Sequence, residues 1–387
     1  MKFAEAMSRL GTETAFEVLA KARALEAQGR EIVHLEIGEP DFDTPSNIVE
    51  EAGTALHRGY THYSPSAGIP ELREAIAEYT SERRGVEVRP EQVVVTPGAK
   101  PIMFFAILAL VEEGDEVLYP NPGFPIYESM INFVGARPVP LVLEEERDFR
   151  FDVSQLEDKV SPLTKMIIVN SPQNPTGGVL TREDLEAIAQ VAEEHDLVVL
   201  TDEVYERILY EGEHISILSL PGMQKRTILL NGYSKTYAMT GWRLGFGVMP
   251  EEIAVHITRL MTNSNSCTAT FTQWAGIEAL RGPQDVVDKM VEEFKRRRDV
   301  IVPGLNAIKG IRCVEPKGAF YVFPNIEGTG MNEREFADYL MEEAGVAVLA
   351  GTSFGEHGRG FIRMSYANSV ENIEKALASI EAALNEL

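Results

Sequence analysis

The sequence has little cysteine and no hydrophobic run long enough to cross a membrane. Its two cysteines, Cys267 and Cys313, are too few for a disulfide framework, and they fit a reducing compartment. No run of 18 apolar residues occurs, and the first residues contain no apolar segment of signal-peptide length. We therefore expect a cytoplasmic protein without a membrane partner.

Positive charge is also scarce. The 36 lysines and arginines stand against 60 aspartates and glutamates, which gives a formal net charge of -24. Such a surface repels phosphate backbones and anionic lipids, so we expect no nucleic-acid or membrane partner. No G-x-G-x-x-G turn follows a strand-like run, which argues against a dinucleotide-binding dehydrogenase. The seven histidines show no spacing that would gather them with carboxylates or cysteines, so no metal site is expected.

Short apolar runs alternate with helical patterns along most of the chain, as in an α/β protein whose mostly parallel sheet is covered by helices. The runs are Gln92–Thr96, Glu116–Tyr119, Met166–Asn170, Leu197–Thr201 and Thr227–Asn231. With 387 residues the chain exceeds the ~250–300 at which one hydrophobic core stops growing. Because the pattern changes near residue 285, we predict a large domain over 41–282 and a smaller α+β domain formed by 1–40 and 283–387.

Residues that could bind or react with a ligand follow three of these runs. Ligands of parallel sheets bind beyond the carboxyl ends of the strands, which is where these residues would lie. The turn of Gly98, Ala99 and Lys100 precedes a helix, and its backbone N–H groups can hold a phosphate. Asp202 ends a buried run and needs a cation or several donors to stay ionised. Lys235 follows the last run, where a desolvated amine becomes a nucleophile toward carbonyl groups. Taken singly, each is also compatible with an ordinary turn, a helix cap or a surface lysine.

The segment around this lysine resembles a known signature. Gly232-x-Ser234-Lys235, followed by Gly241-Trp-Arg243-Leu-Gly245, is similar to the cofactor-attachment motif of class I aminotransferases, which are fold-type I pyridoxal phosphate enzymes. Nearly the whole chain carries further matching motifs in the expected order: Gly38–Phe42, Tyr63 with Gly68–Pro70, Asn121–Tyr127, Asn174–Gly177, Asp202–Tyr205 and Arg363. The resemblance implies the fold-type I architecture, pyridoxal 5'-phosphate as cofactor, and a homodimer with shared active sites.

Carried over residue by residue, the resemblance implies three catalytic side chains. Lys235 would form a Schiff base with the cofactor and move a proton between substrate and cofactor. Asp202 would pair with the pyridine nitrogen, and Tyr205 would hydrogen-bond the 3′ oxygen of the ring. The other expected cofactor contacts are Asn174 at that oxygen, Phe124 stacked on the ring, Gly98, Ala99, Lys100, Ser234 and Arg243 around the phosphate, and Tyr63 from a second subunit. Many relatives carry a serine where this chain has Gly232, so one phosphate contact is missing.

The substrate is expected to bind through arginine and lysine. Arg363 matches the arginine that holds the substrate α-carboxylate in a planar, two-pronged contact, assisted by Asn174 and by backbone at Gly38. Lys100 resembles a lysine of bacterial-type aspartate aminotransferases and would face the distal carboxylate, unless it is only a solvated residue at a helix start.

We therefore expect an aminotransferase with ping-pong chemistry. It would move the amino group of an L-amino acid, aspartate first, to a 2-oxo acid such as 2-oxoglutarate. Three alternatives stay open: a broad or alanine-type specificity, an aromatic specificity, and another pyridoxal phosphate reaction on the same fold, such as that of a C–S or β-lyase.

Overall fold

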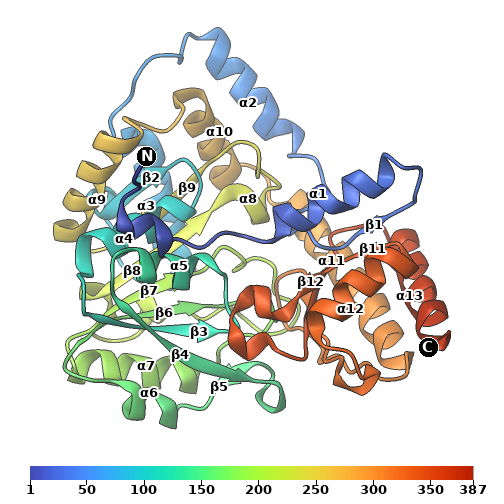
Figure 1. The fold of residues 1–387 in the computed structure, drawn as a ribbon. Helices are drawn as coiled ribbons and strands as arrows, with labels where there is room; N and C mark the ends of the chain where they lie inside the picture. Colours follow the sequence, from blue (N-terminus) through green and yellow to red (C-terminus); the bar gives the residue numbers. More distant parts are fainter. Residues whose placement is uncertain (387) are drawn as a thin grey trace.

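A mostly parallel sheet of eight strands forms the centre of the larger part of the molecule. The structure is a computed structural model and describes residues 1–386. Its strand order is β2-β9-β8-β7-β6-β3-β4-β5 (Figure 1). The strands are β2 (Val93–Thr96), β3 (Glu116–Asn121), β4 (Arg137–Glu144), β5 (Arg150–Phe151), β6 (Thr164–Asn170), β7 (Val198–Asp202), β8 (Thr227–Gly232) and β9 (Gly245–Val248). All five predicted runs form strands, and the α/β prediction is confirmed.

Strand β9 runs antiparallel to both its neighbours β2 and β8, as the edge strand β5 does to β4, and the sequence did not indicate β9. Its Gly-Phe-Gly-Val sequence places two glycines among four residues, a composition that weakens a strand prediction. The first glycine has a packing reason, because a Cβ at Gly245 would lie 2.3 Å from the backbone nitrogen of Ala99. This strand therefore passes directly behind the turn that follows β2.

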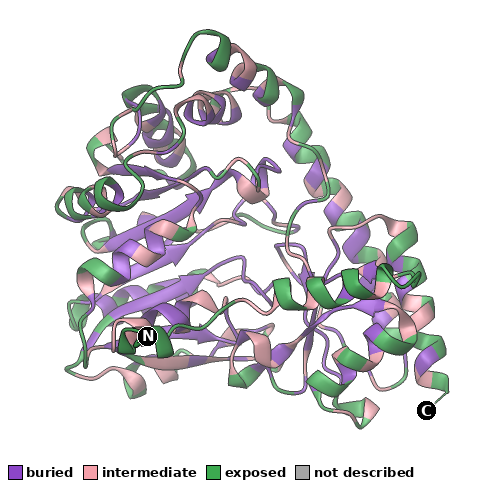
Figure 2. Ribbon diagram, turned by 45° about the horizontal axis from the view of Figure 1, so that its top comes forward, coloured by how far each residue is buried: buried purple, intermediate pink, exposed green. Residues whose placement is uncertain are grey.

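Helices cover both faces of the sheet, because successive residues of a strand point to opposite sides. On one face pack α4 (Lys100–Leu110), α5 (Ile126–Phe133) and α9 (Glu251–Ser264). On the other face, α7 (Arg182–Glu194) covers the β3–β6–β7 side, while α2 (Ser46–His57), α3 (Pro70–Arg84) and α10 (Thr270–Arg281) cover β2, β8 and β9. Figure 2 shows most of the central strands buried, as their nearly continuous apolar runs predict.

The C-terminal residues form a second, smaller assembly of helices and short strands. Its helices are α11 (Asp285–Ala307), α12 (Glu333–Tyr339) and α13 (Val370–Asn385). An antiparallel sheet joins β10 (Tyr321–Val322), β13 (Ile362–Ser365) and β12 (Leu349–Ala350), and β1 (Val33–His34) pairs in parallel with β11 (Val346–Ala347).

The N-terminal segment contacts both parts of the molecule. Figure 1 shows α1 (Ala15–Glu26) and β1 beside the C-terminal helices. Arg9 and Gly11 instead hydrogen-bond to α5, at the Asn132 carbonyl and the Ser129 hydroxyl. The segment between Gly11 and α1 therefore crosses from the larger part to the smaller one. Across residues 1–386, no helix has the length and apolar character needed to cross a membrane.

Candidate active site

A cavity of about 990 Å³ opens at the carboxyl ends of β6, β7 and β8. The strand register brings Asn170, Asp202 and Leu230 to this edge side by side. Of the predicted site residues, those that line the cavity are Gly38, Ala99, Lys100, Phe124, Asn174, Asp202, Tyr205, Ser234, Lys235, Arg243 and Arg363. Gly98 is buried against the lining residue Arg243 but does not itself line the cavity, and Tyr63 is 89% exposed and also does not line it.

Asp202 presents a buried carboxylate to the cavity. The Tyr127 hydroxyl donates a hydrogen bond of 2.6 Å to Oδ2, and the Val204 N–H donates one of 3.3 Å to Oδ1. Burial raises the pKa of the Asp202 carboxyl to about 6, although both donors and, more weakly, Lys235 act to lower it. A cationic group in the cavity would hold this carboxylate ionised, so the site fits the protonated ring nitrogen of the expected cofactor.

Lys235 stands at the end of β8, in the single turn of α8 (Tyr233–Thr236). Its Nζ donates a hydrogen bond of 2.5 Å to the Gly38 carbonyl. Burial lowers the pKa of the lysine to about 8, and the charges of Arg363 and Arg243 act in the same direction. A larger fraction of this amine is therefore neutral near pH 7 than in an ordinary lysine, as a nucleophile requires.

The turn between β2 and α4 forms a candidate phosphate site. The first N–H groups of a helix have no acceptor within the helix, and the positive end of the helix dipole lies there. The Arg243 guanidinium lies against this turn, because a Cβ at Gly98 would come within 2.3 Å of its Nη2. Ser234 lines the same cavity. A Cβ at Gly232 would lie 3.2 Å from that of Ala99, so a serine at position 232 would crowd this turn.

Arg363 is fixed in a geometry suited to a carboxylate. Its guanidinium carbon lies over two aromatic rings, 4.5 Å from the centroid of Tyr321 and 4.8 Å from that of Phe354. Nη1 donates a 3.1 Å hydrogen bond to Asn174 Oδ1, and Nη2 donates to the Glu36 carbonyl. Within residues 1–386 its buried Nε has no hydrogen-bond partner. The planar group is thus held in place and retains a donor for an anion.

Two tyrosines complete the site, and the sequence did not assign them a role. Tyr127 donates to Asp202, and the Tyr321 hydroxyl lies 2.7 Å from that of Tyr205. Burial raises the pKa of Tyr205 well above its usual value, which keeps its hydroxyl protonated. A Cβ at Gly38 would lie 2.3 Å from the Tyr321 hydroxyl oxygen, so this position requires glycine. In the sequence, the one sign of a role for either tyrosine was that Tyr127 is the last residue of the matched motif Asn121–Tyr127.

Lys100 lies at the N-terminal end of α4 with its Nζ 5.4 Å above the centroid of the Phe124 ring. It forms an ion pair with Glu13. Phe124 in turn packs edge-on against Tyr127, with ring centroids 5.7 Å apart. The structure therefore brings together a lysine, an aromatic ring and a carboxylate, and the sequence had indicated only the first two.

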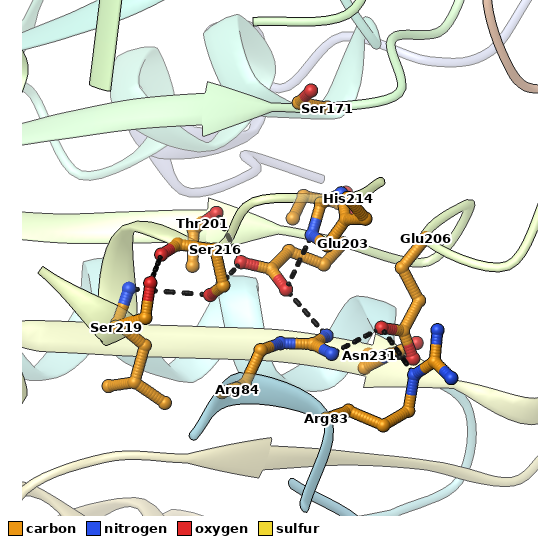
Figure 3. Close-up of polar contacts among 12 residues, drawn as sticks. Arg83, Arg84, Ser171, Thr201, Glu203, Glu206, His214, Ser216, Ser219 and Asn231 are labelled. Carbon is orange, nitrogen blue, oxygen red and sulfur yellow. Dashed lines mark hydrogen bonds and ion pairs between the residues drawn. The ribbon is translucent and has the colours of Figure 1, made fainter. Parts of the chain in front are cut away.

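A buried charge cluster joins Arg84, Glu203, Glu206 and His214 (Figure 3). Arg84, whose side chain is 3% exposed, forms ion pairs of 2.7 Å with Glu203 and 2.5 Å with Glu206. His214 Nε2 lies 3.0 Å from Glu203 Oε2. In the described part of the chain, Glu203, Glu206 and His214 form the one group with metal-ligand geometry, their ligand atoms lying within 4.8 Å of one another.

We assign this cluster as a structural ion-pair network. Arg84 contacts both carboxylates and Arg83 lies 3.5 Å from Glu206, so two arginines balance the two carboxylates and remove the electrostatic demand for a metal cation. The spacing of the histidines along the chain gave no sign that His214 meets Glu203, and the expectation of no metal stays a prediction. Because Glu203 and Glu206 directly follow Asp202 and Tyr205, the network anchors the segment that carries both site residues.

We expect Arg84→Met to lower the free energy of unfolding by about 3–5 kcal/mol, because it removes the buried cation that Glu203 and Glu206 share. Denaturant unfolding at pH 7 measures this loss. The matched control is Arg83→Met, which removes an arginine 3.5 Å from Glu206 that is 36% exposed and should cost at most about 1 kcal/mol. Equal losses for the two variants would contradict the assignment.

The pH dependence of stability follows from the same contacts. Burial raises the pKa of Glu203, but Arg84 and His214 overcome this effect and hold the pKa at about 2, below the usual 4.5. The contribution of ionised Glu203 to the free energy of unfolding is therefore complete above about pH 4.5 and is lost as the pH falls toward 2.

Comparison with known proteins identifies the family of this arrangement. A model of the family described as aminotransferase class I and II matches residues 30–380. The chain is 45% identical to aromatic-amino-acid aminotransferase 2 of Thermococcus litoralis, over 93% of this chain and 94% of that protein. It is 44% identical to an aspartate aminotransferase of Pyrococcus horikoshii, over 95% and 93%. The structure of aspartate aminotransferase from Thermus thermophilus with maleate matches at 39% identity with a TM-score of 0.95, covering 99% of this chain and 100% of that one.

Proposed function

Because the chain belongs to the class I and II aminotransferases, a family that uses pyridoxal phosphate, we propose that it prefers L-aspartate as amino donor and passes the amino group to 2-oxoglutarate. The cofactor, when bound, supplies an electron sink for charge that develops at the substrate Cα. The preference is carried by one observation: Arg363 and Lys100 line the same cavity as Asp202 and Lys235. Two cations in one cavity match the two carboxylates of aspartate.

The side chains of the chain have separate tasks in this proposal. Lys235 holds the cofactor covalently and then carries a proton to and from the substrate Cα, for which its lowered pKa suits it. Asp202, oriented by Tyr127, keeps the ring nitrogen protonated. Tyr205, paired with Tyr321, donates to the ring oxygen together with Asn174.

The remaining groups bind anions and exclude water. Arg243, Ser234 and the turn of Gly98, Ala99 and Lys100 hold the phosphate, while Phe124 covers the ring. Arg363 binds the substrate α-carboxylate, and backbone at Gly38 closes that end of the cavity.

We also propose the domain division 41–282 against 1–40 with 283–387, and a homodimer with shared active sites. Tyr63 supports the second proposal, because a large side chain that is 89% exposed and outside the cavity fits a residue offered to a neighbouring subunit.

We expect aspartate to convert the bound cofactor to its amino form faster than alanine or phenylalanine does. Lys100→Gln should lower kcat/KM for aspartate about 10- to 100-fold and leave alanine within about twofold, because only aspartate loses a charge-assisted contact. Stopped-flow absorbance of the first half-reaction measures both. Aspartate reacting no faster than alanine would refute the preference, and an aspartate rate insensitive to Lys100→Gln would refute the role of Lys100.

A further inference from the structure

We propose that Glu13 sets the range of amino donors by competing with the substrate for Lys100. When the side chain of the amino donor is uncharged, Glu13 stays paired with Lys100, and the ion pair presents no net charge to that side chain. With an acidic donor, the distal carboxylate takes the place of Glu13 on Lys100. The inference rests on the proposed role of Lys100 and names a second residue that controls specificity.

The position of Glu13 is the first support. The ion pair joins two side chains that both line the cavity, and 46% of the Lys100 side chain and 22% of that of Glu13 are exposed. Glu13 lies on a short irregular stretch between Gly11, whose N–H donates a 2.9 Å hydrogen bond to Ser129, and the start of α1 at Ala15. Both ends of this stretch are held in place, and Glu13 lies between the two ends. The carboxylate of Glu13 can therefore leave Lys100 without a movement of α1.

The electrostatic reach of Glu13 is the second support. Its charge raises the pKa of Lys235 and that of Arg363, although burial lowers both more strongly. The carboxylate therefore acts on the centre of the cavity as well as on Lys100. An acidic ligand brings a second negative charge to the same cations, and the two carboxylates repel each other until Glu13 withdraws.

The apolar side chains around the Lys100–Glu13 ion pair explain why the pair suits a donor with an uncharged side chain. Phe16 and Leu19 follow Glu13 along the chain and line the cavity, as does Phe124, whose ring centroid lies 5.4 Å from Lys100 Nζ. A lysine without a partner beside an apolar substrate would lose solvation without compensation, whereas a paired lysine is already neutralised. The ion pair thus makes the same cavity acceptable to aromatic and acidic donors, at the expense of selectivity for the acidic ones.

The decisive experiment compares two unreactive ligands of the holoenzyme, succinate and 3-phenylpropanoate, by titration calorimetry. We expect Glu13→Gln to raise the ratio of succinate to 3-phenylpropanoate affinity about fivefold, the upper end for a partly exposed pair. The ratio of kcat/KM for aspartate to that for phenylalanine should rise by a similar factor. Glu13→Asp keeps the charge but shortens the side chain, so it should give a smaller rise of the same sign.

Glu17→Gln is the matched control, because Glu17 is exposed on the first turn of α1 and does not line the cavity. It should leave the ratio unchanged. A ratio that Glu13→Gln leaves unchanged or lowers overturns the proposal, and so does an equal change in Glu17→Gln. If Lys100→Gln weakens succinate binding while Glu13→Gln has no effect, only this inference fails. If Lys100→Gln has no effect on succinate, the proposed role of Lys100 fails first.

Discussion

Lys235→Ala should abolish turnover, with a fall in kcat of about 10⁴-fold or more, because one amine both holds the cofactor and transfers the proton. Its Nζ is positioned for these tasks, at the end of β8 and beside the Gly38 carbonyl, with its pKa lowered to about 8. Steady-state transamination with aspartate and 2-oxoglutarate measures the loss, and circular dichroism verifies that the variant is folded.

Lys235→Arg separates charge from nucleophilicity. Arginine retains the positive charge but does not lose its proton in the physiological range, so this variant should be as inactive as Lys235→Ala. Retention of more than about one hundredth of the wild-type kcat by either variant would mean that another group performs both steps.

Asp202→Asn should lower kcat by about 10²- to 10³-fold, the usual loss when a preorganised electrostatic group is removed from a reaction centre. Asparagine has nearly the same shape but no charge, so it cannot hold a proton on the ring nitrogen of the cofactor. We expect weaker cofactor binding as well, measured by the absorbance of bound cofactor during dialysis.

Tyr127→Phe provides a graded comparison for this prediction. It removes the 2.6 Å hydrogen bond to Asp202 but leaves the carboxylate in place. The loss of one hydrogen bond from a hydroxyl to this carboxylate should reduce kcat about tenfold, the lower end for a bond to a charged group and less than the loss of the charge itself. If Tyr127→Phe were as harmful as Asp202→Asn, the orientation of the carboxylate would matter more than its charge, contrary to the role assigned here.

Much of the architecture could be predicted because buried parallel strands have a distinct sequence pattern. The runs that became β2, β3, β6, β7 and β8 are apolar on both faces, and their ends identify the edge where Asp202 and Lys235 lie. Strand β9 was missed because its glycines serve close packing, Gly245 against the turn after β2 and Gly247 against Ile102 of α4, a tertiary requirement that local composition does not reveal.

The residues missed at the site share one property, which is that their partners are distant in sequence. Tyr321 lies 116 residues from Tyr205, and Lys100 lies 87 residues from Glu13. Single-sequence patterns report periods of two to four residues, so they indicate which residue ends a strand but not which side chain meets it. The ends of the apolar runs singled out Lys235 and Asp202, and motif resemblance supplied their roles and Arg363. Glu13 belongs to no motif of that kind, and only the structure brings it into the cavity.

The attachment of the cofactor to Lys235 is the central claim, and reductive trapping tests it most directly. The protein would be incubated with pyridoxal phosphate, reduced with borohydride, digested and mapped by mass spectrometry. We predict a visible or near-ultraviolet absorption band before reduction and a stable pyridoxyl group on Lys235 afterwards. A protein without the band after the cofactor is supplied, or a pyridoxyl group found mainly on another lysine, would contradict the account.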